Sequence, residues 1–137
     1  MPCAFCQVVA KSVDSLVVFD DEHTLAFLDH RPLFPGHCLL IPKTHYETLS
    51  DLPPALIEPL FSAAQRLALA VETGMRAEGS FVAINNRISQ SVPHLHIHIA
   101  PRRKKDGLKG FFWPRNRYES PEAAIIVQRA IVNALKR

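Results

Sequence analysis

The chain has 137 residues, of which 47% are hydrophobic and 21% are charged, and its formal net charge is +3. These values are typical of one globular domain with a sizeable core. No apolar run approaches the roughly 20 residues of a membrane-spanning helix, and no basic segment followed by an apolar one marks a signal peptide. Three cysteines do not form a secreted disulfide framework, so we expect a cytoplasmic, reducing location.

Hydrophobic patterning predicts about five strands and two main helices. We expect strands at residues 16–20, 24–28, 37–42, 80–85 and 92–100, and helices over about 54–73 and from 121 onward. Gly74 suits the end of the first helix, and Ser120 is a candidate N-cap for the second. Because tight turns connect most of the strands, the fold class is α+β with an antiparallel sheet.

The predicted strand over residues 92–100 carries His94, His96 and His98 at every second position. Strand geometry places alternate side chains on one face, so the three imidazoles form a row while the apolar residues between them enter the core. Three interpretations remain open at this point. The row is a polar strand face, a metal site, or a covalent catalytic site in which one imidazole attacks and its neighbours assist.

A basic segment follows this strand, with seven Lys or Arg residues between positions 102 and 117 and one acid, Asp106. Most of these charges fit a solvated loop, although they also fit a rim that attracts an anionic substrate. Phe111, Phe112 and Trp113 lie in the same segment and suit stacking on bases. Packing under a loop or at a subunit interface is the commoner role, so we expect no nucleic acid partner.

Several motifs occur in an order that resembles the histidine-triad (HIT) family of nucleotide hydrolases and transferases. They are CAFC, LAFLD, PGHCLLIPKTHY, an Asn at a strand end, and QSVPHLHIHIAPR. The resemblance covers about residues 3–103. It implies a single HIT domain over 1–137, with an extension and helix at 104–137. It also implies a homodimer that binds a purine nucleotide.

The resemblance implies roles for individual side chains. His96 would attack the α-phosphate to form a nucleotidyl-histidine, His98 would assist the leaving group, and His94 would help to orient His96. His at the third triad position rather than Gln favours hydrolysis, so the implied reaction releases a nucleoside monophosphate from a phosphoramidate or a dinucleoside polyphosphate. The residues that match the phosphate site are His37, Asn85, Gln90 and Ser91. Those that match the nucleoside pocket are Phe5, Val8, Phe27 and Leu28, with Asp29 as the acceptor for the ribose hydroxyls.

The loop that follows Asn85 departs from the family pattern. It is shorter than usual and has no glycine, and Ser89 stands where glycine is usual. Glycine allows backbone amides to approach a phosphate closely. This departure supports an alternative function, a nucleotide-binding regulatory module with weak or no catalysis.

The pair Cys3-x-x-Cys6 has the spacing of zinc ligands, and tetrahedral zinc requires two more. The resemblance implies His45 and His94 as these ligands, in a structural zinc site. The competing interpretation is a pair of reduced cysteines near the N-terminus. A zinc hydrolase that uses the triad itself as ligands is disfavoured, because zinc in the family lies elsewhere.

Overall fold

The computed structural model of the chain describes residues 2–108 and 115–136. It divides into two compact units, Met1–Asp106 and Gly107–Arg137. No helix in the described ranges is long and apolar enough to cross a membrane. The expectations for Phe111, Phe112 and Trp113 fall outside the described residues.

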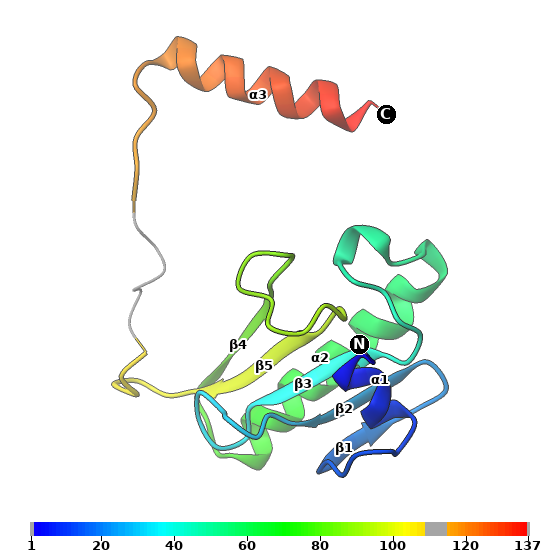
Figure 1. Ribbon diagram of the computed structural model, residues 1–137. Helices are drawn as coiled ribbons and strands as arrows, with labels where there is room; N and C mark the ends of the chain where they lie inside the picture. Colours follow the sequence, from blue (N-terminus) through cyan, green and yellow to red (C-terminus); the bar gives the residue numbers. More distant parts are fainter. Residues whose placement is uncertain (1, 109–114, 137) are drawn as a thin grey trace. The chain divides into compact units, whose positions relative to one another are not determined.

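The first unit is built on one five-stranded sheet with the strand order β1-β2-β3-β5-β4, in which every neighbouring pair is antiparallel (Figure 1). The elements in chain order are α1 (Ala4–Val9), β1 (Val17–Asp20), β2 (Thr24–Leu28), β3 (Cys38–Pro42), the 3-10 turn η1 (Leu49–Asp51), α2 (Pro54–Gly74), β4 (Gly79–Ile84), β5 (Ile97–Arg102) and α3 (Pro121–Leu135). The predicted α+β class and antiparallel sheet are confirmed.

The register of the sheet decides which side chains share a face. Leu39 of β3 pairs with Phe27 of β2 on one side and with His98 of β5 on the other. Directly paired residues point to the same face of an antiparallel sheet. These three side chains therefore line one face, while Leu40 and its partner Ile97 line the opposite face.

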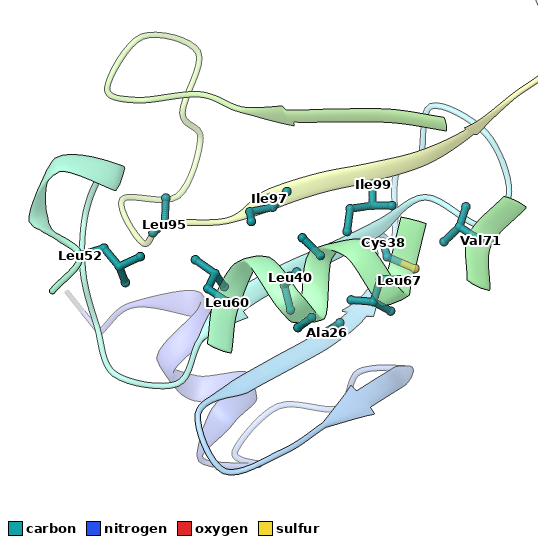
Figure 2. Close-up of a cluster of buried hydrophobic side chains, with 12 residues drawn as sticks. Ala26, Cys38, Leu40, Leu52, Leu60, Leu67, Val71, Leu95, Ile97 and Ile99 are labelled. Atoms are coloured by element: carbon teal, nitrogen blue, oxygen red, sulfur yellow. The ribbon is translucent and has the colours of Figure 1, made fainter. Parts of the chain in front are cut away.

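Helix α2 covers the face that carries Leu40 and Ile97 (Figure 2). Its buried residues recur at helical spacing and are Leu60, Ala63, Ala64, Leu67 and Val71. They pack on the apolar residues that alternate with the histidines, so the prediction that these residues enter the core is confirmed. Burial of each large aliphatic side chain contributes about 1.5–3 kcal/mol to folding stability. This packing holds β5 firmly against α2.

Helix α1 belongs to a second apolar cluster, on the other face of the sheet. Phe5 packs there with Leu25, Phe27, Leu39 and Ile41. The sequence pattern does not predict α1, because six residues without a capping side chain give almost no periodic signal. The helix nevertheless places its residues beside the histidines.

The strand predicted over residues 92–100 begins five residues later than expected, at Ile97. The backbone N–H of Leu95 donates to the carbonyl of Tyr46, and the N–H of His94 donates to the carbonyl of Val92. Because of these bonds, the residues just before β5 do not pair with the neighbouring strands of the sheet. His94 and His96 therefore precede the strand, and only His98 lies within it. The predicted N-cap of α3 is confirmed, since the Ser120 hydroxyl accepts from the N–H of Ala123.

Candidate active site and metal site

His96 is held with one ring nitrogen committed and the other free to react. The side chain is 4% exposed, and Nδ1 lies 2.7 Å from the carbonyl oxygen of His94. A carbonyl only accepts, so Nδ1 carries the proton and donates it in this hydrogen bond. The neutral ring therefore has its lone pair on Nε2, the state that a nucleophilic imidazole requires.

His98 is oriented by a chain of hydrogen bonds that starts at a backbone amide. The N–H of Leu33 donates to Nδ1 of His37 over 3.0 Å, so the neutral His37 ring carries its proton on Nε2. That nitrogen lies 3.0 Å from Nδ1 of His98 and donates to it. The neutral His98 ring then carries its own proton on Nε2, where it is available to a leaving group.

The imidazole rings of His37 and His98 are both neutral near pH 7. Burial and the nearby His96 and His37 lower the pKa of His98 to about 4. Burial also lowers the pKa of His37, and the charge of Asp29 opposes that shift only in part. A neutral pair preserves the single direction of the hydrogen-bond chain, because protonated rings would offer no acceptor nitrogen.

Asp29 joins the histidines to a neighbouring cavity. One of its carboxylate oxygens lies 3.8 Å from Nε2 of His37, and the other accepts from the N–H of Arg31. The cavity has a volume of about 550 Å³. Its lining includes all five residues predicted for the nucleoside pocket, namely Phe5, Val8, Phe27, Leu28 and Asp29.

Part of the cavity wall consists of residues that the sequence pattern does not predict. Gln7 of α1 and residues 13–16, which connect α1 to β1, also line the cavity. The segment lacks a periodic pattern, and its position depends on where α1 lies. An apolar cavity of this size bordered by a few polar groups is typical of a small-ligand site.

In the loop predicted to hold phosphate, some side chains make hydrogen bonds within the protein and others do not. Gln90 and Asn86 anchor the loop: Gln90 accepts from the N–H of Arg87 and donates to the carbonyl of Glu47, while Asn86 accepts from the N–H of Leu49. Asn85 directly follows β4, and Ser91 follows the loop. Within residues 2–108 and 115–136 the side chains of Asn85 and Ser91 make no hydrogen bond, so they are free to meet a ligand.

The loop reaches its shape without glycine. Arg87 has φ 68° and Ser89 has φ 61°, both in the left-handed region that glycine occupies most easily. The backbone form that glycine would favour is therefore present, at a cost of about 1–2 kcal/mol for each non-glycine residue.

Cys3, Cys6, His45 and His94 converge on one point beside the histidines. Their potential ligand atoms all lie within 4.8 Å of one another. The Sγ atoms of Cys3 and Cys6 are 3.4 Å from Nδ1 of His94 and of His45 respectively, and the two Nδ1 atoms are 3.2 Å apart.

This donor set fits tetrahedral zinc. With Zn–N bonds of about 2.0–2.1 Å and Zn–S bonds of about 2.3 Å, the edges of the tetrahedron are about 3.3 Å between nitrogens and about 3.6 Å between nitrogen and sulfur. Nε2 of His94 donates to the carbonyl of Pro42 over 2.8 Å, so the His94 lone pair is on Nδ1 and faces the other ligands. Burial and the neighbouring Cys3 raise the pKa of the Cys6 thiol, so binding of zinc would release protons.

The basic segment after β5 is partly committed to local contacts. The Arg102 guanidinium pairs with the Asp106 carboxylate over 2.6 Å, and Arg103 donates to the carbonyl of Met75. The remaining charges of the segment stay candidates for attraction of an anionic substrate.

The HIT domain family model matches residues 10–105 of the chain. An uncharacterized HIT-like protein of Saccharolobus solfataricus is 34% identical over 98% of both chains. The protein therefore belongs to the HIT family, as its histidine run and accompanying motifs predicted.

Two relatives carry the names of nucleotide-processing enzymes. Adenylylsulfatase HINT3 of Arabidopsis thaliana is 33% identical over 77% of this chain and 55% of its own length. A bis(5'-nucleosyl)-tetraphosphatase of Schizosaccharomyces pombe is 34% identical over 69% of this chain and 53% of its own length.

Solved structures of HIT proteins share the fold. A HIT family member from Bacillus subtilis superimposes with a TM-score of 0.88 at 34% identity, covering 97% of this chain and 96% of that one. A zinc-bound histidine triad protein from Mycobacterium smegmatis has a TM-score of 0.75 at 34% identity, covering 99% and 97%.

Proposed function

We propose that the protein is a hydrolase that cleaves at the α-phosphate of a purine nucleoside phosphoramidate or dinucleoside polyphosphate and releases the nucleoside monophosphate. The observation that carries the proposal is the hydrogen bond from Nδ1 of His96 to the carbonyl of His94. It leaves Nε2 as a lone-pair nucleophile beside a cavity of nucleoside size.

The first step forms a bond between Nε2 of His96 and the α-phosphorus. The bond from phosphorus to the leaving group breaks and its electron pair goes to the leaving group, which in the case of a phosphoramidate takes a proton from solvent and departs as ammonia. The Nε2–H of His98 donates a hydrogen bond to that group as its negative charge develops. The nucleotidyl-imidazole is cationic, and the carbonyl of His94 stabilises it through the proton on Nδ1.

The second step is hydrolysis of the nucleotidyl-histidine. Water attacks the same phosphorus, the bond to Nε2 breaks and returns its electron pair to the ring, and the proton that the water loses passes to solvent. Asn85 and Ser91 are the proposed contacts for the phosphoryl oxygens, whereas both ring nitrogens of His37 are already engaged by Leu33 and His98. Gln90 holds the loop in place through its bonds to Arg87 and Glu47.

The nucleoside is proposed to occupy the cavity of about 550 Å³. Phe5, Val8, Phe27 and Leu28 would contact the base, and the Asp29 carboxylate would accept from the ribose hydroxyls. Asp29 lies both on the cavity wall and beside His37, so a ribose held there would direct its phosphate toward the histidines. The enzyme names of the two relatives support nucleotides as the substrate class.

Cys3, Cys6, His45 and His94 are the proposed ligands of a structural zinc ion. Four protein ligands leave no position for a metal-bound water, so the zinc would supply stability rather than take part in hydrolysis. A zinc hydrolase that uses the triad itself as ligands is not proposed, because His94 already belongs to the four-ligand cluster with Cys3, Cys6 and His45.

We also propose a homodimer in the cytoplasm. Helix α3 carries apolar residues at helical spacing, among them Ile126, Ile131 and Leu135. An apolar surface of this kind is typical of a face that meets another subunit.

A panel of substrates tests the proposed activity. Wild-type protein and His96→Ala would be incubated with adenosine phosphoramidate, diadenosine tri- and tetraphosphate, and the guanosine counterparts. We expect release of AMP or GMP that the variant abolishes. Folded wild-type protein that binds AMP but releases no product would favour the alternative, a nucleotide-binding regulatory module, for which the short, glycine-free loop after Asn85 is the supporting observation.

A further inference from the structure

We propose that Phe5 is a positioning residue for the His96 imidazole, and that a metal ion at Cys3, Cys6, His45 and His94 fixes Phe5 in place. Metal binding and nucleotide binding are then thermodynamically linked through α1. This inference rests on the proposed function, because it concerns the same nucleotide cavity.

Helix α1 has little stability of its own. It has six residues, and its N-cap residue, Cys3, makes no capping hydrogen bond through its side chain. Isolated helices shorter than about 12 residues are marginal in water. Anchors outside the helix must therefore fix α1, and two of the four candidate metal ligands, Cys3 and Cys6, lie at its start and within its first turn.

Phe5 lies between these two cysteines in the chain, and its ring meets the active-site rings. The centroid of the Phe5 ring is 5.0 Å from that of His96, with an angle of 88° between the planes. A second edge-to-face contact, at 5.4 Å and 70°, joins Phe5 to Phe27 of the cavity wall. Phe5 is 8% exposed, so these contacts fill its surroundings and limit rotation of the imidazole.

The same short helix forms part of the nucleotide cavity. Phe5, Gln7 and Val8 all line it. A shift of α1 would therefore change both the wall that meets the nucleoside and the packing against the nucleophile.

His94 provides a second route between the two sites. Its Nδ1 faces the cysteines, while its carbonyl accepts the proton of His96 Nδ1 over 2.7 Å. The candidate metal ligands that are buried or half-buried are therefore all close in the chain to an atom group that contacts His96.

Linkage makes a reciprocal prediction. Ordering α1 costs conformational entropy. When a metal ion has already ordered α1, nucleotide binding no longer carries that part of the cost. Each ligand should therefore raise the affinity for the other by the same factor. Couplings between distinct sites typically correspond to about 5- to 150-fold.

The test uses the full chain in two forms, loaded with Zn²⁺ and stripped with a chelator. Titration calorimetry gives the Kd of AMP for each form, and competition with a chromophoric chelator gives the Kd of Zn²⁺ with and without saturating AMP. We expect at least a fivefold change, equal in the two directions. Equal AMP affinity in the two forms would overturn the linkage, whereas failure of AMP to bind the zinc-loaded protein would overturn the proposed function itself.

A variant keeps the test decisive if the stripped protein unfolds. Phe5→Leu in the zinc-loaded chain removes the ring and leaves every metal ligand. We expect a lower kcat and loss of the enhancement of Zn²⁺ affinity by AMP. The matched control is Phe61→Leu, at a phenylalanine of α2 that is 40% exposed, which should change none of these values. Retention of the AMP enhancement and of kcat in Phe5→Leu would refute the positioning role.

Discussion

The hydrogen-bond chain from Leu33 through His37 to His98 predicts how substitutions of His37 affect catalysis. His37→Ala removes the donor that fixes the proton of His98 on Nε2, and it leaves Nδ1 of the half-buried His98 without that partner. The Nε2–H of His98 is then no longer held toward the leaving group, and a hydrogen bond to a charged group contributes about 1.5–3 kcal/mol. At about 1.36 kcal/mol for each factor of ten in rate, kcat should fall roughly 10- to 150-fold.

The size of the fall should depend on the leaving group. A poor leaving group, such as the amine of adenosine phosphoramidate, needs the Nε2–H of His98, whereas nitrophenolate leaves without help. The assay compares kcat for adenosine phosphoramidate and for the nitrophenyl ester of AMP in wild type, His37→Ala and His37→Gln. We expect a large loss with the phosphoramidate and a small loss with the ester. Because the amide N–H of Gln replaces the missing donor, His37→Gln should recover part of the rate. Equal losses with both substrates, or a His37→Gln variant no better than His37→Ala, would refute the reasoning.

Three further predictions concern stability. Ile97→Ala should lower the free energy of unfolding by about 2–5 kcal/mol because Ile97 is fully buried, whereas Val82→Ala, at a residue that is 49% exposed, should lower it by less than half as much in the same urea titration. Ser89→Gly should raise the free energy of unfolding by about 1 kcal/mol by relieving the φ of 61°, and a decrease would show that the loop does not adopt this form. The folded-state pKa of His98, about 4, lies below its ordinary value of 6.5, so the unfolded chain takes up the proton first as the pH falls. His98 should therefore cost no stability above pH 6.5 and up to about 3 kcal/mol near pH 4, less any screening by solvent. Urea titrations at pH 7 and pH 4.5 should show a smaller pH-dependent loss in His98→Gln than in wild type, and equal losses would contradict the shift.

Regular elements with strong periodicity were predictable from the sequence. The helix from residue 54 was placed correctly because its buried residues recur at helical spacing. The strand at 24–28 is almost continuously buried, and it was placed correctly because a short apolar run follows a polar turn. The identity of the triad and of the nucleoside-pocket residues came from the motif order rather than from periodicity. Those pocket residues all line one cavity in the structure.

Features that depend on long-range backbone contacts were not predictable. β5 starts at Ile97 because Leu95 pairs with the carbonyl of Tyr46, a residue 49 positions earlier in the chain. The orientation of His98 depends on the amide of Leu33, and a backbone N–H has no sequence signature. Gln90 matched a phosphate contact in the family pattern, whereas here its amide group bridges Arg87 and Glu47.

The most direct test of the account is a search for the covalent intermediate on His96. Zinc-loaded protein would be mixed with adenosine phosphoramidate, quenched in alkali within the first turnover, and examined by mass spectrometry for a peptide that carries an adenylyl group. The account predicts the adduct on His96, its absence in His96→Ala, and a fall in turnover of at least about a thousandfold in that variant. An adduct on another residue, or AMP release by His96→Ala at the wild-type rate, would contradict it.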